Sequence, residues 1–279
     1  GIDPGWQGIR LVDLRRRWRR WQLRACCCLP LEPSLRADVN ALSAALKTAA
    51  VRRGFQFWRC PEVAMALPVS EITVNTRPLP DGATEEEAEF IAKMEAGPEQ
   101  LMDYRCITRA DSAAELLLLS CPQGCRDRFA MLAAAAGGHL AALGVDVLQI
   151  ADRFAAEVPS GIDLLLVDMG SASVRLSVFR DRLPVYWRNH AVAEGMTSLS
   201  VLVRALQHYR MTEMPAAGLH VLLYGSRAAD PEIRCTLESF CGVEPETLDP
   251  FAALGLSAPV GICPSEFVLA CALASQELP

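Results

Sequence analysis

The sequence predicts an α/β protein of two lobes, with a small α+β subdomain inserted into the first lobe. Three observations support this fold class. The 279 residues, 51% apolar and 22% charged, suffice for two compact units with buried cores. Residues 1–12 and 165–179 share one pattern, in which an apolar strand runs into Asp-x-Gly and a second strand follows. Between them, residues 61–121 show strand and helix signals in the order β-β-α-β-β, typical of a separate α+β unit.

The first lobe is assigned to residues 1–60 and resumes at 135–158. Residues 1–31 predict two or three strands, because apolar and polar side chains alternate there. A helix is expected over 35–53, where apolar residues recur three to four positions apart. These apolar residues are Leu35, Val39, Leu42 and Leu46.

The inserted subdomain is assigned to residues 61–134. Thr84 and Glu87 form a capping-box sequence, so a helix should begin at Glu85 and run to about Met94. The expected strands of the subdomain cover 63–68, 71–80, 103–109 and 115–121. After them we expect a second helix over 125–143 and a strand over 145–150.

The second lobe is assigned to residues 159–279. Its expected strands cover 164–170, 174–179, 183–189 and 221–225. Its expected helices cover 195–210, 231–240 and 265–274. Both halves begin with a strand, Asp-x-Gly, a meander of strands and a helix, which indicates an internal repeat.

The two Asp-x-Gly turns have the chemistry of a phosphate site. A glycine lets a backbone N–H group approach a phosphate closely, and successive turn N–H groups form an anion nest. The carboxylates of Asp3 and Asp168 cannot bind phosphate but can hold a hydrated Mg²⁺ that does. Each following strand carries an arginine, Arg10 or Arg175. Either turn alone is an ordinary hairpin turn, whereas the matching pair predicts a nucleotide cleft between two hairpins.

These segments resemble a known family. GIDPGWQGIRLVDL (1–14), the stretch from VAMALP (63–68) to EEEAEF (85–90), and LLLVDMGSASVRLSVFRDRLPVYWR (164–188) occur in the order of the actin-like ATPase (ribonuclease H-like) fold. They are most similar to its PilM and HofM-type members, which serve type IV pilus, pseudopilus and competence systems. The inserted subdomain resembles the extra subdomain of the FtsA cell-division protein.

The resemblance implies an ATP site with Mg²⁺ held through water by Asp3 and Asp168. Asp152 lies near an acidic position of the family, but we interpret it as an acid at the start of a helix. No catalytic residue is assigned. The residues assigned to cofactor binding are Asp3, Gly5, Gly8, Asp168, Gly170, Ser171, Ser173, Gly225 and Ser226.

The sequence departs from the family at three places. Trp6 and Gln7 follow the first turn, where small hydroxyl residues are usual. Tyr224 stands at a glycine position of the late turn, and Cys271 replaces a small residue of the closing helix. We therefore expect a degenerate or weak ATP–Mg²⁺ site, and a protein that is a degenerate member of the fold rather than an active ATPase.

The stretch RRRWRRWQLR (15–24) contains six arginines and two tryptophans. Arginine stacks on tryptophan and binds phosphate in bidentate fashion, so a nucleic-acid or anionic-lipid surface is one interpretation. A solvated hairpin tip explains the pattern more simply and is favoured. Pairing within the chain with Glu85–Glu87 and Glu89 is a further alternative.

Other function classes have less support. A net charge of −6 argues against a protein whose whole surface binds nucleic acid. The eleven cysteines include three in a row at 26–28, which indicates reduced thiols rather than a disulfide framework. The sequence contains no P-loop, no Gly-x-Ser-x-Gly motif and no apolar run near the ~18 residues of a membrane span.

The resemblance implies a scaffold. We expect a cytoplasmic protein, peripheral to the inner membrane, that binds the short cytosolic tail of a PilN-like partner between the first-lobe core and the inserted subdomain. Residues 63–80 and 85–95 are the expected walls of that groove. The alternatives are an active ATPase or kinase of the same fold, and a nucleic-acid or anionic-membrane adaptor acting through Arg15–Arg24. Self-association is left open.

Overall fold

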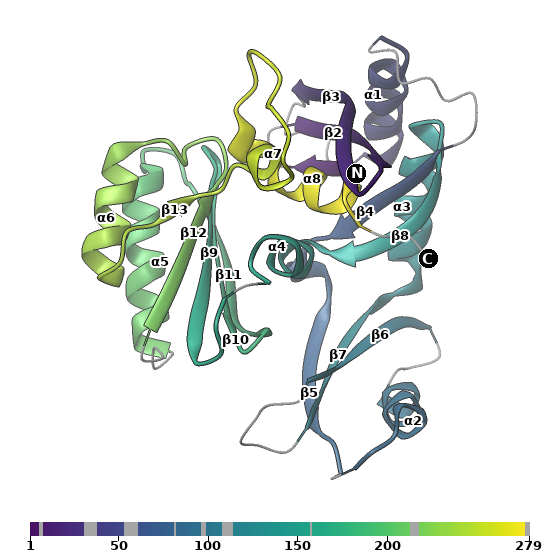
Figure 1. Cartoon of the computed structure of the whole chain (residues 1–279), viewed down its shortest axis with the longest axis vertical. Coiled ribbons are helices and arrows are strands. Elements are labelled where there is room, and N and C mark those ends of the chain that lie inside the picture. Colours follow the sequence, from purple (N-terminus) through teal and green to yellow (C-terminus); the bar gives the residue numbers. More distant parts are fainter. Residues whose placement is uncertain are drawn as a thin grey trace.

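A computed structural model describes most of the chain and shows two lobes side by side, with a third unit attached to the first lobe (Figure 1). The expectations for Trp6, Gln7 and Leu35 lie outside the described residues. The described ranges are 1–5, 8–30, 38–52, 61–80, 82–95, 99–107, 114–156, 158–212 and 218–276.

The first lobe is built on strands from both ends of its assigned sequence. β1 (Ile2–Gly5), β2 (Gly8–Arg17) and β3 (Arg20–Pro30) form an antiparallel sheet. β4 (Glu62–Leu67) lies beside β1 and pairs in parallel with β8 (His139–Val145). α1 (Val39–Arg52) and α3 (Gln123–Ala135) pack against each other over these strands. One apolar core unites these elements, and its members include Ile9, Leu46, Met65 and Leu132.

The second lobe repeats this arrangement. Its sheet has the order β11-β10-β9-β12-β13, which corresponds to β3-β2-β1-β4-β8 in the first lobe, so the predicted internal repeat is present. α5 (Ser198–Thr212) and α6 (Pro231–Cys241) cover its outer face (Figure 1). The strands are β9 (Ile162–Met169), β10 (Ser173–Arg180), β11 (Leu183–Ala191), β12 (Gly218–Tyr224) and β13 (Glu246–Thr247).

Two helices join the lobes. α4 (Asp146–Phe154) follows β8, and α8 (Val268–Ala274) follows α7 (Pro250–Ala253) and the short helix η3 (Pro264–Phe267). α4 and α8 pack against each other, and their apolar side chains share a core with residues of both lobes. Six of the seven α8 residues are buried apolar side chains, which is typical of a helix enclosed on all sides.

The inserted subdomain is a three-stranded antiparallel sheet with one helix. η2 (Val69–Glu71) leads into β5 (Thr73–Pro78), and β7 (Glu115–Pro122) lies between β5 and β6 (Gln100–Ile107). α2 (Glu85–Glu95) covers one face. The predicted capping box is confirmed, since Glu87 N donates to Thr84 Oγ1 over 3.2 Å and Thr84 N to the Glu87 carboxylate over 2.8 Å.

The structure corrects the expected boundaries of this subdomain. β4 and α3 were assigned to residues 61–134, but their apolar side chains fill the first-lobe core. The helix expected over 125–143 ends at Ala135, before Gly137 at φ 83°, and β8 follows. The segment 145–150, expected as a strand, begins α4, because a short apolar run does not distinguish a buried strand from a buried helix.

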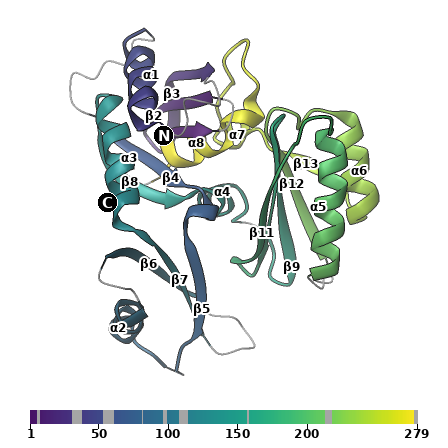
Figure 2. The same cartoon turned by 180° about the vertical axis from the view of Figure 1, so that it is seen from behind.

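The basic hairpin and the acidic helix lie far apart. β2 and β3 lie at one end of the long axis and α2 at the other, in both views of the molecule (Figures 1 and 2). The intramolecular pairing of Arg15–Arg24 with Glu85–Glu87 and Glu89 is therefore wrong. Among the described residues, no helix is long and apolar enough to cross a membrane.

Candidate functional site

The residues assigned to a phosphate site line one small cavity between the lobes. Asp3 and Gly5 reach it from β1, and Asp168 and Gly170 reach it from the end of β9. Ser173, Gly225 and Ser226 complete this set. Gly170 N donates to the carbonyl of Ser173 over 3.0 Å, which closes the turn of the second hairpin.

Two assigned residues do not line this cavity. Gly8 pairs with Pro30, and a Cβ at Gly8 would lie 2.2 Å from the carbonyl oxygen of Leu29. The glycine is therefore required by the close approach of β3. Ser171 is an exposed residue of the turn between β9 and β10.

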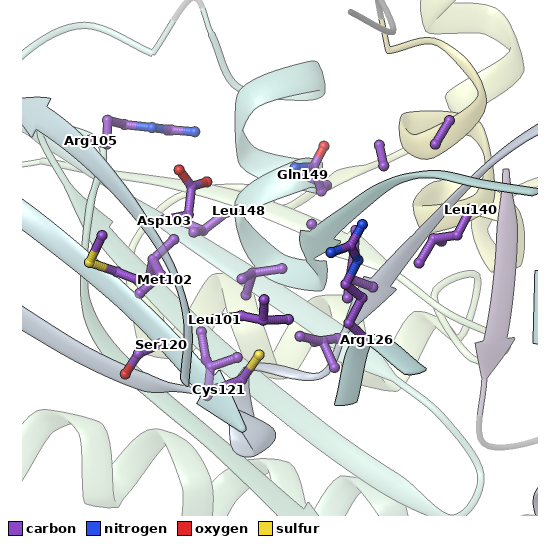
Figure 3. Close-up of a pocket in the computed structure, with 18 residues that line it drawn as sticks. Leu101, Met102, Asp103, Arg105, Ser120, Cys121, Arg126, Leu140, Leu148 and Gln149 are labelled. Atoms are coloured by element: carbon purple, nitrogen blue, oxygen red, sulfur yellow. The ribbon is translucent and has the colours of Figure 1, made fainter. Parts of the chain in front are cut away.

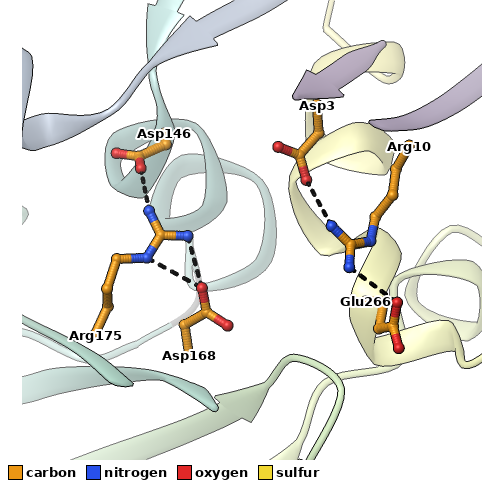
Figure 4. Close-up of polar contacts among 6 residues, drawn as sticks. All are labelled: Asp3, Arg10, Asp146, Asp168, Arg175 and Glu266. Carbon is orange, nitrogen blue, oxygen red and sulfur yellow. Dashed lines mark hydrogen bonds and ion pairs between the residues drawn. The ribbon is translucent and has the colours of Figure 1, made fainter. Parts of the chain in front are cut away.

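An arginine stands directly opposite each of the two aspartates. Asp3 pairs with Arg10 in the β1–β2 ladder, and Asp168 pairs with Arg175 in the β9–β10 ladder. Arg175 Nε and Nη2 donate to one Asp168 carboxylate oxygen over 3.1 and 2.6 Å (Figure 4). Arg10 Nη1 lies 3.8 Å from the Asp3 carboxylate. The repeat thus carries two equivalent cross-strand ion pairs.

Each arginine also binds a second carboxylate from across the cleft. Arg175 Nη1 donates to Asp146, the first residue of α4, over 2.6 Å. Asp146 in turn accepts from the backbone N–H groups of Val69 and Val147. Arg10 Nη2 donates to Glu266 of η3 over 2.9 Å. These contacts connect the β1–β2 and β9–β10 hairpins to the segments that join the lobes (Figure 4).

Burial and charge shift the pKa values of this cluster. Burial raises the pKa of Asp3 to about 6, although Arg10 and Arg175 oppose the shift. Burial also raises the pKa of Asp146, against the lowering effect of Arg175. For Arg175 burial would lower the pKa, but Asp168 and Asp146 outweigh it, so its pKa lies above the usual range and the guanidinium stays charged.

These residues do not fit a Mg²⁺–nucleotide as they are arranged. The cavity that contains both Asp3 and Asp168 measures about 60 Å³, whereas ligand pockets usually measure roughly 300–1,000 Å³. A larger cavity of about 680 Å³ shares Asp3, Gly5 and Arg175 with it, but neither Asp168 nor the second hairpin turn lines that larger cavity. Carboxylate oxygens of Asp3 and Asp168 that would hold hydrated Mg²⁺ face guanidinium groups. Within the described part of the chain, no group of three or more His, Cys, Asp or Glu could hold a metal ion.

The turn after β12, at Tyr224 and Gly225, further reduces the space in the cavity. A Cβ at Gly225, whose φ is 99°, would lie 2.6 Å from Asp168 Oδ1, so this glycine serves the packing of two turns. The Tyr224 side chain is buried and lines the same cavity. Burial first, and Asp168 second, raise the pKa of Tyr224 well above its usual value. Cys271 is fully buried in the core between α8 and the first-lobe sheet.

The expectation for Asp152 is corrected. Asp152 is the seventh residue of α4, and it accepts two hydrogen bonds from Arg105 of β6 over 2.8 and 2.6 Å. The acid at the start of α4 is Asp146, which sequence reasoning missed because the segment was expected to be a strand. Glu266 was also missed. The equal spacing of seven residues between Asp3 and Arg10 and between Asp168 and Arg175 indicates the ion pair within each hairpin, but no local pattern indicates Asp146 or Glu266.

A second candidate site is a groove between the first lobe and the inserted subdomain, lined mainly by apolar residues with several polar ones among them (Figure 3). One wall is β8, whose residues 140–145 all line the groove, and the other is β6 with Leu101, Met102 and Asp103. Leu119 and Leu148 contribute apolar surface, and the groove measures about 210 Å³. Among the described strands, β8 pairs only with β4 and β6 only with β7, so each presents an edge.

The expected walls of the groove are partly wrong. Leu67 and Ile72, from the range 63–80, line the groove. Residues 85–95 do not, because α2 packs with Leu116 and Leu118 on the other face of the subdomain sheet. The charged rim consists of Asp103, Arg105 and Arg126, of which Arg105 is held by Asp152.

Comparison with known proteins shows the fold. No protein-family model and no curated protein sequence matches the chain. The structure described as a PilM–PilN type IV pilus biogenesis complex matches with a TM-score of 0.73 at 18% identity, over 98% of this chain and 96% of that one. A Bacteroides thetaiotaomicron protein of actin-like ATPase fold matches with a TM-score of 0.57 at 12% identity, over 99% and 95%. MreB5 of Spiroplasma citri with AMPPNP matches with a TM-score of 0.50 at 10% identity, over 97% and 93%. The chain has the actin-like ATPase fold, as the sequence predicts.

Replacing Arg175 should destabilise the protein strongly. Arg175→Ala leaves the buried Asp146 and the half-buried Asp168 without their cation, so we expect the free energy of unfolding to fall by about 3–5 kcal/mol. Urea unfolding followed by circular dichroism measures this. Arg188→Ala, an exposed arginine of β11, should change stability by less than about 0.5 kcal/mol. Equal unfolding midpoints for the two variants would contradict the prediction.

The titration of Asp3 should lower the free energy of unfolding as the pH rises from about 4 to about 6. In this window the folded protein keeps a proton on Asp3 that the unfolded chain releases, because burial raises the pKa from 3.8 to about 6. Above the window, ionised Asp3 costs up to about 3 kcal/mol.

The urea midpoint of unfolding of Asp3→Asn should therefore be higher than that of the wild type at about pH 7.5. Near pH 4 the two midpoints should be equal. The control is Asp13→Asn, at a less buried acid of the same sheet. If Asp3→Asn and the wild type lose stability in parallel over this range, the assignment is wrong.

Proposed function

We propose that the chain is a scaffold of a type IV pilus, pseudopilus or competence assembly complex that binds the cytosolic tail of a PilN-like membrane partner. The observation that carries this proposal is the groove between β6 and β8, in which two strand edges face one apolar space. An extended peptide can add to a strand edge through main-chain hydrogen bonds while its alternate side chains enter an apolar groove.

The chemistry of the groove fits a short, mostly apolar peptide. Leu101, Leu119 and Leu148 offer apolar contact, and the charges of Asp103 and Arg126 lie at the rim. The likeness to the PilM–PilN structure supports this class of partner, because that structure pairs the same fold with PilN. A partner of this kind places the chain in the cytoplasm, peripheral to the inner membrane.

The scaffold works without nucleotide in this proposal. The two arginines neutralise carboxylates that would otherwise need a bound cation, and the cavity that contains both Asp3 and Asp168 measures only about 60 Å³. The rival function is an active ATPase or kinase of the same fold, which requires the arginine network to open. The two functions differ in whether ATP and Mg²⁺ bind at all.

Titration calorimetry with ATP and Mg²⁺ distinguishes these functions. We expect no binding heat up to about 1 mM ATP for the wild type or for Asp168→Ala. Micromolar binding by the wild type that is lost in Asp168→Ala would overturn the nucleotide-independent scaffold and favour the ATPase. A circular dichroism spectrum of each sample confirms that the protein is folded.

Binding of the partner tail should depend on the edge of β8. Ala141 lines the groove and belongs to none of the apolar core clusters, so Ala141→Glu should leave the fold intact and place a charge in the peptide path. We expect at least a tenfold loss of affinity for a synthetic peptide of the PilN-like tail, with or without ATP and Mg²⁺.

The matched control is Ala25→Glu. Ala25 is a half-buried residue of β3, the strand at the opposite edge of the same lobe, and it does not line the groove. Fluorescence anisotropy of a labelled tail peptide measures both affinities. Equal affinities of the two variants would show that the peptide does not use this groove.

A further inference from the structure

The tip of the β2–β3 hairpin is a tight turn made of unusual residues. Arg17 and Arg20 form the last pair of the ladder, so Trp18 and Arg19 are the two turn residues. Their φ angles are 51° and 65°, which is the geometry of a type I′ turn. Such turns favour Asn-Gly, because a bulky residue at positive φ is strained. The Trp18 side chain is 88% exposed, so contacts within the protein do not account for it.

The corresponding hairpin of the second lobe gives a direct comparison. The β10–β11 turn also has two residues at positive φ, Asp181 and Arg182. There the Asp181 carboxylate accepts hydrogen bonds from Ser160 Oγ and Gly161 N, so the turn residue has a structural role. Trp18 occupies the equivalent place and projects into solvent. A strained residue that the fold does not use indicates a function.

The arginines of the tip extend beyond the packed part of the hairpin. Leu14 and Leu23 are paired across the ladder and pack on the core around Phe251 and Phe267. Beyond this pair the hairpin continues for about 10 Å, at roughly 3.3 Å per residue. Its exposed side chains there belong to Arg15, Arg16, Arg17, Trp18, Arg19 and Arg20.

The charge of the tip is not balanced locally. Arg16 stacks over Trp21, with its guanidinium 5.6 Å from the ring centre. In the described ranges, no carboxylate forms an ion pair with Arg15, Arg17, Arg19 or Arg20. The chain as a whole carries a net charge of −6, so the tip is a local concentration of positive charge on an acidic protein. Such a cluster attracts anionic surfaces.

We propose that the hairpin tip binds the surface of a bilayer that contains anionic phospholipids. Tryptophan partitions to the headgroup level of a membrane, and arginines near an anionic surface are attracted to lipid phosphates. A projecting tip with one exposed ring suits a flat surface. Single-stranded nucleic acid is instead bound along grooves with several stacking rings, and Trp21 is covered by Arg16 and the core.

This contact goes beyond tail binding and does not depend on it. The tip and the β6–β8 groove belong to different elements, and the groove contains no residue of β2 or β3. A scaffold that contacts lipid directly would be held at the membrane by two weak attachments, which increases the residence of each through effective concentration.

Flotation with lipid vesicles tests the proposal. The full chain is mixed at about 0.1 M salt with vesicles of phosphatidylcholine alone, or with about one-third phosphatidylglycerol. We expect binding only to the anionic vesicles, and a decrease as salt is added. The triple variant Arg15→Gln/Arg17→Gln/Arg20→Gln should bind about 100-fold more weakly, since each arginine contributes roughly fivefold. The control Arg153→Gln/Arg188→Gln/Arg204→Gln makes the same charge change at exposed arginines elsewhere.

A second variant separates binding from folding. Trp18→Asn/Arg19→Gly installs the favoured type I′ turn, so it should raise the urea midpoint of unfolding while weakening vesicle binding. Brominated lipids should quench the tryptophan fluorescence of the wild type more strongly than that of Trp18→Phe.

Three results would overturn the proposal. One is equal binding to neutral and anionic vesicles. Another is equal weakening by the tip variant and the control variant. The third is tighter binding of a single-stranded oligonucleotide than of anionic vesicles at the same salt, lost in the tip variant, which would assign the tip to nucleic acid.

Discussion

The junction of the two lobes depends on the ion pairs of Arg175 with Asp146 and Asp168. Three charged groups at the cleft between the lobes would destabilise the protein if they were separated, and they are tolerated because each guanidinium edge faces a carboxylate. The Asp146 carboxylate also accepts hydrogen bonds from the backbone N–H groups of Val69 and Val147, which attaches the start of α4 to the segment after β4. Arg10 repeats the arrangement with Asp3 and Glu266. The lobes are thus joined at the cleft by two equivalent groups of charged side chains.

α4 relates the cleft to the groove. Its first residue, Asp146, belongs to the arginine network, its middle residues Leu148 and Gln149 line the groove, and Asp152 near its end binds Arg105 of β6. α4 therefore contacts both the arginine network and the groove.

The two hairpins of the repeat have diverged in what their turns do. The β10–β11 turn is attached to the segment before β9 through Asp181, whereas the β2–β3 turn presents Trp18 and several arginines to solvent. The difference is chemical rather than architectural, since both turns have two residues at positive φ. A repeat supplies two copies of each element, so one copy can serve stability while the other acquires a surface role.

The sequence by itself determined the fold class, the repeat and seven of the nine residues that were assigned to the cleft cavity. Asp-x-Gly hairpins are local, and their turn chemistry and strand pattern are readable over about fifteen residues. Thr84 and Glu87 likewise fixed the start of α2, because a capping box is made within one turn. The likeness in motif order also predicted the actin-like fold that the structural comparison shows.

Tertiary structure alone decided what the cleft contains. Asp146 and Glu266 reach the arginines from segments 29 and 256 positions away, and no local pattern marks such pairs. β8 is a second example: its sequence predicted part of a helix, but its residues form a strand that pairs with β4. α4 is a third, because its apolar residues predicted a strand and form a helix. Local sequence sets what a segment can become, whereas burial against distant partners selects which conformation it adopts and which charges it brings together.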